Sequence, residues 1–119
     1  AEEGYLEGWK RFLRFKSVST DPAYDGDCRR CVEWLREELH RMGFTSRIEE
    51  TPGKPAVFAE RAGAKDLPTV LYYGHYDVQP ADPVELWESD PFEPEVRSGR
   101  MYARGAEDNK GQTYAFLKG

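Results

Sequence analysis

Apolar residues recur at helical spacing in two segments near the start of the chain. The first segment contains the set Tyr5, Trp9, Phe12, Leu13 and Lys16. This spacing of three to four residues predicts a helix over about 4–16. A second helix is predicted to begin near Asp25 or Asp27, either of which can cap it, and to run to about Met42, with Gly43 as its stop signal. The chain is therefore expected to open with two helices joined by a short polar loop.

The pattern then changes to one typical of strands. Short runs over 46–50 and 56–60 predict two strands. The run Thr-Val-Leu-Tyr-Tyr over 69–73 is continuously apolar and rich in β-branched or aromatic residues. Such a run is expected for a strand that is buried on both faces. This strand is therefore the predicted centre of a sheet.

The last third of the sequence predicts a loop, a hairpin and a helix. Residues 81–94 are rich in Pro and Asp and predict the loop. Ser98 and Gly99 interrupt the stretch 95–102 and predict a two-residue hairpin turn. Residues 109–118 read as a helix. The order of helices, strands, hairpin and helix predicts an α/β fold with a mixed β-sheet flanked by helices.

Length and charge narrow the class of protein. The chain has 119 residues, which is enough for one domain with a core. With 17 Lys and Arg against 22 Asp and Glu, the net charge is -5, the wrong sign for a nucleic-acid binder. No apolar run approaches the roughly 20 residues of a membrane span. The acidic start, 1–4, is unlike a signal peptide. We therefore expect a cytoplasmic protein without nucleic-acid or membrane partners.

Cys28 and Cys31 form a C-x-x-C pattern that has three interpretations. It could be half of a zinc site or a redox pair, but there is no second C-x-x-C to complete a zinc site. Positions three apart share one face of a helix. The other apolar residues on that face are Val32, Leu35, Leu39 and Met42. The pattern therefore favours two thiols packed in the core, where free cysteines are most often found.

His75 and Asp77 follow the predicted central strand directly. Residues two apart in extended backbone project to the same face, so the two side chains can point together. A histidine that binds a metal through one nitrogen needs its other N–H fixed, often by a carboxylate. The pair therefore fits a metal site at a strand end. The alternative is a structural histidine that is satisfied by its neighbour.

Glu107 and Asp108 lie in a glycine-containing bend before the last predicted helix. A carboxylate there can be a metal ligand, and its two oxygens can bridge two cations. The alternative is that Asp108 caps the helix, because helix N-termini stabilise negative charge. Taken alone, this segment favours the cap.

Together, these segments resemble the zinc metallopeptidase family of carnosinase, non-specific dipeptidase, aminoacylase and succinyl-diaminopimelate desuccinylase. The resemblance rests on G-H-x-D-V-Q-P at 74–80, then Trp87, then P-F-E-P at 91–94 and R-G-A-x-D-x-K-G at 104–111. The predicted pair of helices, with 17–19 after the first, is similar too. The resemblance covers essentially the whole chain.

The resemblance implies roles for particular residues. His75 would ligate one metal ion, Asp77 would act as the catalytic support that orients His75, and Asp108 would bridge two zinc ions. The peptide bond after Asp108 would be cis, as is common in the family. Asn109 stands where many members have Asp, and Glu107 stands where a smaller residue is frequent. The role of Glu107 is left open.

The resemblance further implies an enzyme, an exopeptidase-like hydrolase in which metal assists hydrolysis of an amide bond. The expected substrates are dipeptides or small N-acyl amino acids. The residues at 78–80 (V-Q-P) and 91–94 (P-F-E-P) resemble the dipeptidase branch more than the aminoacylase or deacylase branch. Zinc is the expected metal, with cobalt or manganese as alternatives. The full-length protein is expected to be a homodimer.

Residues 1–119 are expected to be an N-terminal fragment of the catalytic domain that is inactive alone. In the family, the general-base Glu, further ligands and a lid domain lie downstream. A non-catalytic remnant or interaction module with the same fold stays an alternative, as does a redox or single-metal protein that uses the cysteines. No substrate-binding residue is identified. Trp87 and Phe92 are placed at the loop rim or in the loop core, and Arg104 and Lys110 are interpreted as structural ion partners.

Overall fold

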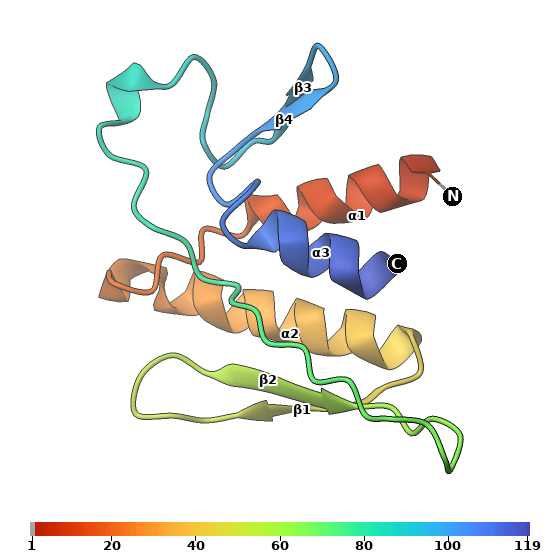
Figure 1. Ribbon diagram of the computed structural model, residues 1–119. Coiled ribbons are helices and arrows are strands. Elements are labelled where there is room, and N and C mark those ends of the chain that lie inside the picture. Colours follow the sequence, from red (N-terminus) through yellow and green to blue (C-terminus); the bar gives the residue numbers. More distant parts are fainter. Residues whose placement is uncertain (1) are drawn as a thin grey trace.

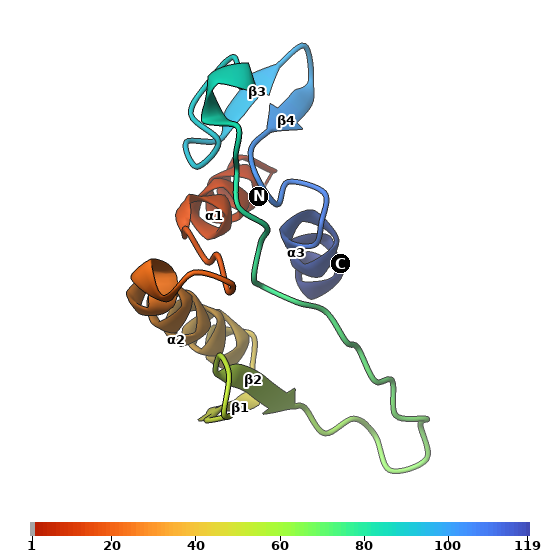
Figure 2. The same cartoon turned by 90° about the vertical axis from the view of Figure 1, so that its left-hand side faces the viewer.

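The computed structural model describes residues 2–119 and contains three α-helices (Figure 1). They are α1 (Glu2–Arg14), α2 (Asp25–Arg41) and α3 (Lys110–Lys118). The helices α1 and α3 lie side by side, although they come from opposite ends of the chain. Helix α2 lies between this pair and a hairpin of two strands (Figures 1 and 2). The layers of the molecule are thus built from segments that are distant in sequence.

The core forms where the three helices meet. Its buried cluster consists of Phe12, Cys31, Trp34, Leu35 and Tyr114. The rings of Phe12 and Trp34 lie 5.3 Å apart, within the usual range for paired aromatic rings. Each helix contributes to this cluster, so the helical spacing of apolar residues in the sequence correctly located the core. The interpretation of Cys28 and Cys31 as packed thiols is also confirmed, because both are free and fully buried.

Both helix ends near the first loop differ from the prediction. Helix α1 ends at Arg14 rather than near residue 16. Neither Asp25 nor Asp27 caps α2, whose N-cap is Tyr24 without a side-chain cap bond. Asp21 instead caps a short 3-10 helix, Pro22–Tyr24, that leads into α2. The two aspartates lie in the first turn of α2, where negative charge is favourable without a direct cap.

The strands form two separate antiparallel pairs. Strands β1 (Thr45–Glu49) and β2 (Ala56–Glu60) pair with each other and pack on α2. Strands β3 (Glu95–Arg97) and β4 (Arg100–Tyr102) form the predicted hairpin. At its turn Ser98 has φ 50° and Gly99 has φ 74°, as the tight two-residue turn of a hairpin requires. The α/β class is confirmed, with helices packed beside small sheets.

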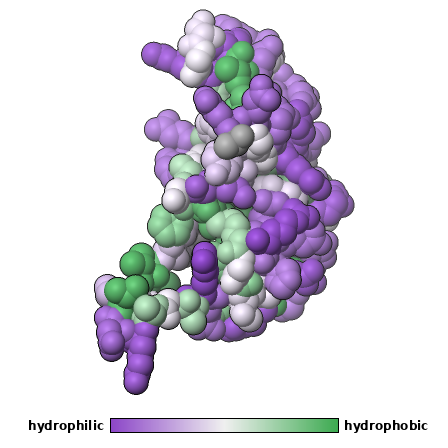
Figure 3. All heavy atoms as spheres, turned by 90° about the vertical axis from the view of Figure 1, so that its right-hand side faces the viewer, coloured by the Kyte–Doolittle hydropathy of each residue, from purple (hydrophilic) through white to green (hydrophobic). Residues whose placement is uncertain are grey.

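The predicted central strand at 69–73 is the largest departure. This segment is extended, but among residues 2–119 it pairs with no other strand. Val70 is 78% exposed, and Leu71 and Tyr73 are each 88% exposed. Apolar side chains gather on the projecting end of the molecule in Figure 3. The prediction of a strand buried on both faces was wrong for this structure, because local pattern cannot supply the neighbours that bury it.

Two contacts hold the extended segment against α3. The ring of Tyr72 stacks on that of Phe116 at 3.9 Å, and its hydroxyl donates to Thr113 Oγ1 at 3.1 Å. Gly74 passes close to the same helix, and a Cβ there would lie 2.8 Å from Thr113 Oγ1. The glycine therefore permits the close approach that places the next residue, His75, at the N-terminal end of α3.

Within the described part of the chain, no helix has both the length and the apolar character to span a bilayer.

Candidate functional site

The segment that carries His75 and Asp77 is fixed by the loop after α1. Val18 and Val78 form a parallel β-bridge, in which Val78 N donates to Ser17 O at 2.9 Å. The Ser17 hydroxyl donates to Tyr76 O at 2.7 Å. These bonds end the unpaired run and hold the backbone on both sides of Asp77. Residues of the predicted loop after the first helix, which spans 17–22, therefore support the site.

The imidazole of His75 lies between two carboxylates. Its Nδ1 is 3.1 Å from Asp77 Oδ1 and 3.1 Å from Asp77 O. Its Nε2 is 3.1 Å from Asp108 Oδ1. The tautomer with its hydrogen on Nδ1 directs that hydrogen at the two acceptor oxygens of Asp77. In the neutral ring, Nε2 then presents its lone pair to Asp108.

Ser19 supports the other oxygen of Asp77. The Ser19 hydroxyl donates to Asp77 Oδ2 at 2.5 Å, a short charge-assisted hydrogen bond. Asp77 Oδ2 thus accepts a hydrogen bond from Ser19, while Asp77 Oδ1 lies 3.1 Å from His75 Nδ1 and the main-chain Asp77 O is the hydrogen-bond partner of that nitrogen. These contacts orient the His75 ring from the side of Asp77. The predicted pairing of His75 with Asp77 agrees with this geometry, and the contribution of Ser19 was missed.

Asp108 is brought to His75 by the bend before α3. Gly105 has φ 83°, and a Cβ there would lie 2.7 Å from Val78 Cγ1. Glycine is therefore required both by the backbone conformation and by the close approach to the His75 segment. The peptide bond between Asp108 and Asn109 is cis, as the family resemblance implied. Asp108 does not cap α3, whose N-cap is Asn109.

Lys110 anchors the start of α3 to the end of α1. It is fully buried, and its Nζ donates to Phe12 O at 3.1 Å and to Phe15 O at 2.7 Å. These carbonyls lie at the C-terminal end of α1, where a cation is favourable. Burial lowers the pKa of Lys110 to about 8. Burial of the Cys31 thiol itself raises its pKa to about 12.

The interpretation of Lys110 and Arg104 as ion partners was wrong. Within residues 2–119 neither side chain forms a salt bridge. Lys110 satisfies main-chain carbonyls, and the Arg104 guanidinium lies 5.3 Å from the centroid of the Trp87 ring. Local sequence pattern could not show that α1 would end beside α3, where its carbonyls receive Lys110.

The donor atoms at the site fit a divalent metal ion. When the ring is neutral with its hydrogen on Nδ1, Nε2 of His75 and Oδ1 of Asp108 each present a lone pair to the other. A cation between the two atoms is therefore favourable. Imidazole nitrogen and carboxylate oxygen are usual zinc ligands, and two such ligands on one tetrahedral zinc lie about 3.3 Å apart. Their separation of 3.1 Å is close to that value. Among the described residues, however, no group of three or more His, Cys, Asp or Glu side chains could hold a metal.

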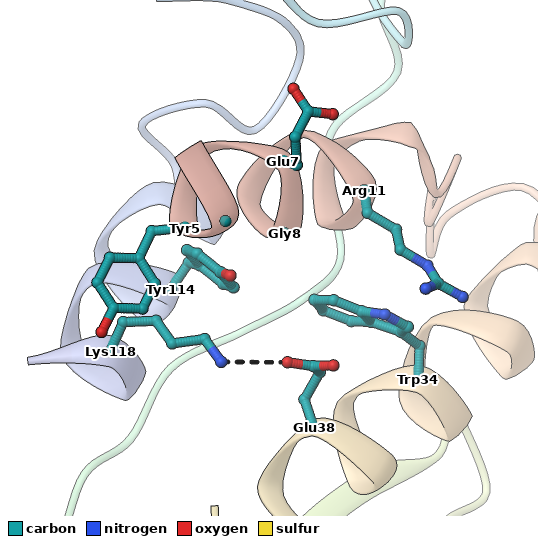
Figure 4. Close-up of a pocket in the computed structure, with 9 residues that line it drawn as sticks. Tyr5, Glu7, Gly8, Arg11, Trp34, Glu38, Tyr114 and Lys118 are labelled. Carbon is teal, nitrogen blue, oxygen red and sulfur yellow. Dashed lines mark hydrogen bonds and ion pairs between the residues drawn. The ribbon is translucent and has the colours of Figure 1, made fainter. Parts of the chain in front are cut away.

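Two surface hollows lie away from this pair. One, of about 500 Å³, is lined by residues of the three helices, including Trp34 and Tyr114, with Lys118 paired to Glu38 across it (Figure 4). The other, of about 680 Å³, is lined by residues of the 80–92 loop with Lys16 and Tyr24. Neither is lined by His75, Asp77 or Asp108.

Trp87 and Phe92 both line the hollow beside the 80–92 loop. The indole Nε1 of Trp87 donates to Ala81 O at 2.9 Å. This bond ties two parts of the same loop together, so the placement of Trp87 in the loop core agrees with the structure.

Comparisons of sequence and structure agree with the resemblance. Residues 71–119 match the sequence model of peptidase family M20/M25/M40. The chain is 40% identical over 87 residues to the succinyl-diaminopimelate desuccinylase of Nitrosospira multiformis and 41% identical over 92 residues to that of Delftia acidovorans. Each alignment covers 73% of this chain, but only 22% and 24% of those proteins. The chain therefore spans about a quarter of the length of the curated relatives it matches.

Solved structures share the fold over nearly the whole chain. The structure of human carnosine dipeptidase 1 matches 98% of this chain with a TM-score of 0.88 at 28% identity. A metallo-carboxypeptidase from Sulfolobus solfataricus matches 96% with a TM-score of 0.86 at 36% identity. This chain covers 27% and 25% of those two chains.

Proposed function

Because residues 71–119 match the sequence model of peptidase family M20/M25/M40, we propose that the chain belongs to this family and forms part of a metal-dependent hydrolase that cleaves amide bonds in dipeptides or small N-acyl amino acids. The relatives support this class, since they include desuccinylases, a dipeptidase and a carboxypeptidase by name. All of these reactions hydrolyse an amide bond. The proposal covers the class of reaction, with dipeptides as the favoured substrates and aminoacylase or deacylase activity as the alternative.

The convergence of His75 and Asp108 carries the proposal. The two residues are 33 positions apart in sequence, and Nε2 of His75 lies 3.1 Å from Oδ1 of Asp108. Asp108 is 84% exposed and His75 42% exposed, so neither side chain is there to fill the core. The bend at Gly105 and the buried Lys110 bring these two polar side chains together at the surface. Packing of the core does not need this contact, so a binding role explains it better.

Each residue has a distinct role in the proposed site. His75 would bind the metal ion through Nε2, and Asp108 would bind it through its carboxylate. Asp77 would hold the hydrogen on Nδ1 of His75 and so keep the lone pair of Nε2 directed at the metal. A bound zinc ion supplies Lewis acidity and lowers the pKa of water toward neutrality. Zinc is the proposed metal, and cobalt or manganese could replace it.

The described residues supply too few ligands for catalysis. A protein zinc site normally uses three or four protein ligands, and residues 2–119 bring only two donors together here. We therefore propose that this chain is a part of the catalytic domain, and that the other ligands, the general base and a lid domain for dimerisation lie outside it. The 119 residues alone should not hydrolyse dipeptides. A cytoplasmic location is also proposed, consistent with the two buried free thiols.

A zinc titration of this chain tests the proposed ligands. The parent, His75→Ala and the double variant Cys28→Ala/Cys31→Ala would be titrated by calorimetry at pH 7.5. We expect weak binding by the parent and a loss of at least about tenfold in His75→Ala, because a ligand is removed. The cysteine variant should bind as the parent does, since both thiols are buried in the core.

Two results would contradict the proposal. If the cysteine variant loses zinc while His75→Ala keeps it, the thiols are the metal site and a redox or single-metal protein is favoured. If neither substitution changes binding, His75 and Asp108 are not ligands, and a non-catalytic module with this fold is favoured. Circular dichroism of each variant would show that the folded state is retained.

A further inference from the structure

Asn109 makes two hydrogen bonds that join the two halves of the site. Its Oδ1 accepts from His75 N at 3.2 Å and from Thr113 Oγ1 at 2.9 Å. His75 belongs to the extended segment, whereas Asn109 follows Asp108 directly and is the N-cap of α3. One side-chain oxygen therefore bridges the segment that carries His75 and the helix start that carries Asp108.

The side chain of Asn109 does not serve its own helix as a cap normally does. An N-cap asparagine usually accepts a hydrogen bond from a backbone N–H in the first turn. Here no such side-chain bond is formed, although Asn109 O does accept from Thr113 N at 3.0 Å. The amide oxygen is directed at His75 instead. A residue that gives up its usual capping bond indicates a requirement outside the helix.

Thr113 fixes the position of that oxygen. Thr113 is buried, donates its hydroxyl to Asn109 and accepts the hydroxyl of Tyr72 at 3.1 Å. Tyr72 lies three residues before His75, so the chain of bonds leaves the extended segment at Tyr72 and returns to it at His75. Buried hydroxyls are nearly always satisfied, which makes this arrangement well determined. The loop of bonds leaves little freedom for His75 to move relative to α3.

We infer that Asn109 is a positioning residue that sets the distance between His75 Nε2 and Asp108 Oδ1. This inference rests on the proposed function, because the distance matters only if both atoms bind one metal ion. The required chemistry is a side-chain oxygen that accepts two hydrogen bonds. Aspartate supplies the same oxygen at the same reach, whereas alanine supplies none.

The test compares Asn109→Ala with Asn109→Asp in this chain. Zinc chloride would be titrated by calorimetry, and exchange of the His75 backbone N–H would be followed by NMR. We expect Asn109→Ala to bind zinc at least about tenfold more weakly than the parent, as is typical when a group that orients a ligand is lost. The His75 N–H should exchange faster in this variant. Asn109→Asp should bind at least as well as the parent and restore protection of that N–H.

Controls separate positioning from stability. Ser46→Ala removes a side-chain hydrogen bond to Arg36 O, far from the site in sequence, and should leave zinc binding unchanged. If Asn109→Ala unfolds, Thr113→Val replaces it, since the valine keeps the shape but cannot donate to Asn109. We expect that variant to weaken zinc binding severalfold.

The outcomes distinguish this inference from the proposed function. If the parent binds zinc through His75 and Asn109→Ala binds it equally well, the positioning role is overturned and the metal site stands. If Asn109→Asp fails to restore what Asn109→Ala loses, the shared oxygen is not the cause and the inference is also overturned. If the parent binds no zinc, the proposed function fails, and the inference fails with it.

Discussion

Two apolar regions of this molecule have opposite fates. The helical region, formed by α1, α2 and α3, buries its apolar side chains, and Phe12 and Leu13 of α1 have no exposed surface. The extended segment 69–73 is at least as apolar, yet Leu71 and Tyr73 remain 88% exposed. Hydrophobic burial contributes free energy only when a partner surface removes the side chain from water. Both regions are rich in apolar side chains. They differ in burial because only the helical region has a partner surface to pack against.

The candidate site lies where these two regions meet. The extended segment is unpaired up to Tyr73, and from His75 onward it is held by Asn109, Ser17 and Ser19. Polar bonds from the helical region thus fix the segment at the point where its chemistry begins. The site therefore depends on the helices for its geometry, with Tyr72 as the one residue of 69–73 that is hydrogen-bonded to them, and not on the exposed Leu71 and Tyr73.

The largest expected contrast is between Phe12→Ala and Leu71→Ala. Removing the buried ring should lower the free energy of unfolding by about 3–5 kcal/mol, since it leaves a cavity. Removing the exposed leucine should change it by no more than about 0.5 kcal/mol. Urea denaturation followed by circular dichroism measures both. An equal loss in the two variants would mean that Leu71 is covered in solution, and sedimentation would then show whether copies of the chain associate.

A smaller effect is expected from Lys110→Met, which breaks the link between α3 and α1. The carbonyls of Phe12 and Phe15 would lose their buried donor, which should cost about 1–2 kcal/mol of stability. Urea denaturation at pH 7 measures this loss. An unchanged midpoint would show that water replaces the ammonium at no cost.

The difference in stability between the parent and Lys110→Met is expected to depend on pH. The pKa of Lys110 is lowered from 10.5 to about 8 in the folded chain. Between these values the unfolded chain binds more protons, so the parent gains stability as pH rises. From pH 7 to 8.5 the advantage of the parent over Lys110→Met should grow by up to about 1 kcal/mol. A shrinking advantage would contradict the burial of the charged amine.

The smallest effect is expected from Ser19→Ala, at the boundary between the regions. The lost bond is to a carboxylate, so the free energy of unfolding should fall by about 1 kcal/mol. Ser46→Ala, which loses an exposed bond to a neutral carbonyl, should cost about 0.5 kcal/mol or less. Thermal or urea denaturation compares the two. If Ser46→Ala costs more, the bond from Ser19 to Asp77 does not hold the segment.

Local pattern alone determined much of this protein. The spacing of apolar residues predicted the first two helices, because an amphipathic stripe encodes the face that packs, and residues 109–118 were also read as a helix. Ser98 and Gly99 predicted the hairpin turn, because few residues adopt positive φ. The C-x-x-C pair was correctly interpreted as packed thiols from its place in the stripe. The motifs around His75 and Asp108 indicated the family, although neither motif alone distinguished a ligand from a structural residue.

Only the tertiary structure decided how these parts meet. The sequence could not show that Lys110 would reach the carbonyls of α1, that Ser19 would hold Asp77, or that Asn109 would bond to His75 N. These contacts join residues between 34 and 98 positions apart, and no local periodicity encodes such a pairing. The burial of 69–73 also failed as a prediction for the same reason. A local pattern states what a segment can bury or bind, and the three-dimensional fold determines which partner is there to receive it.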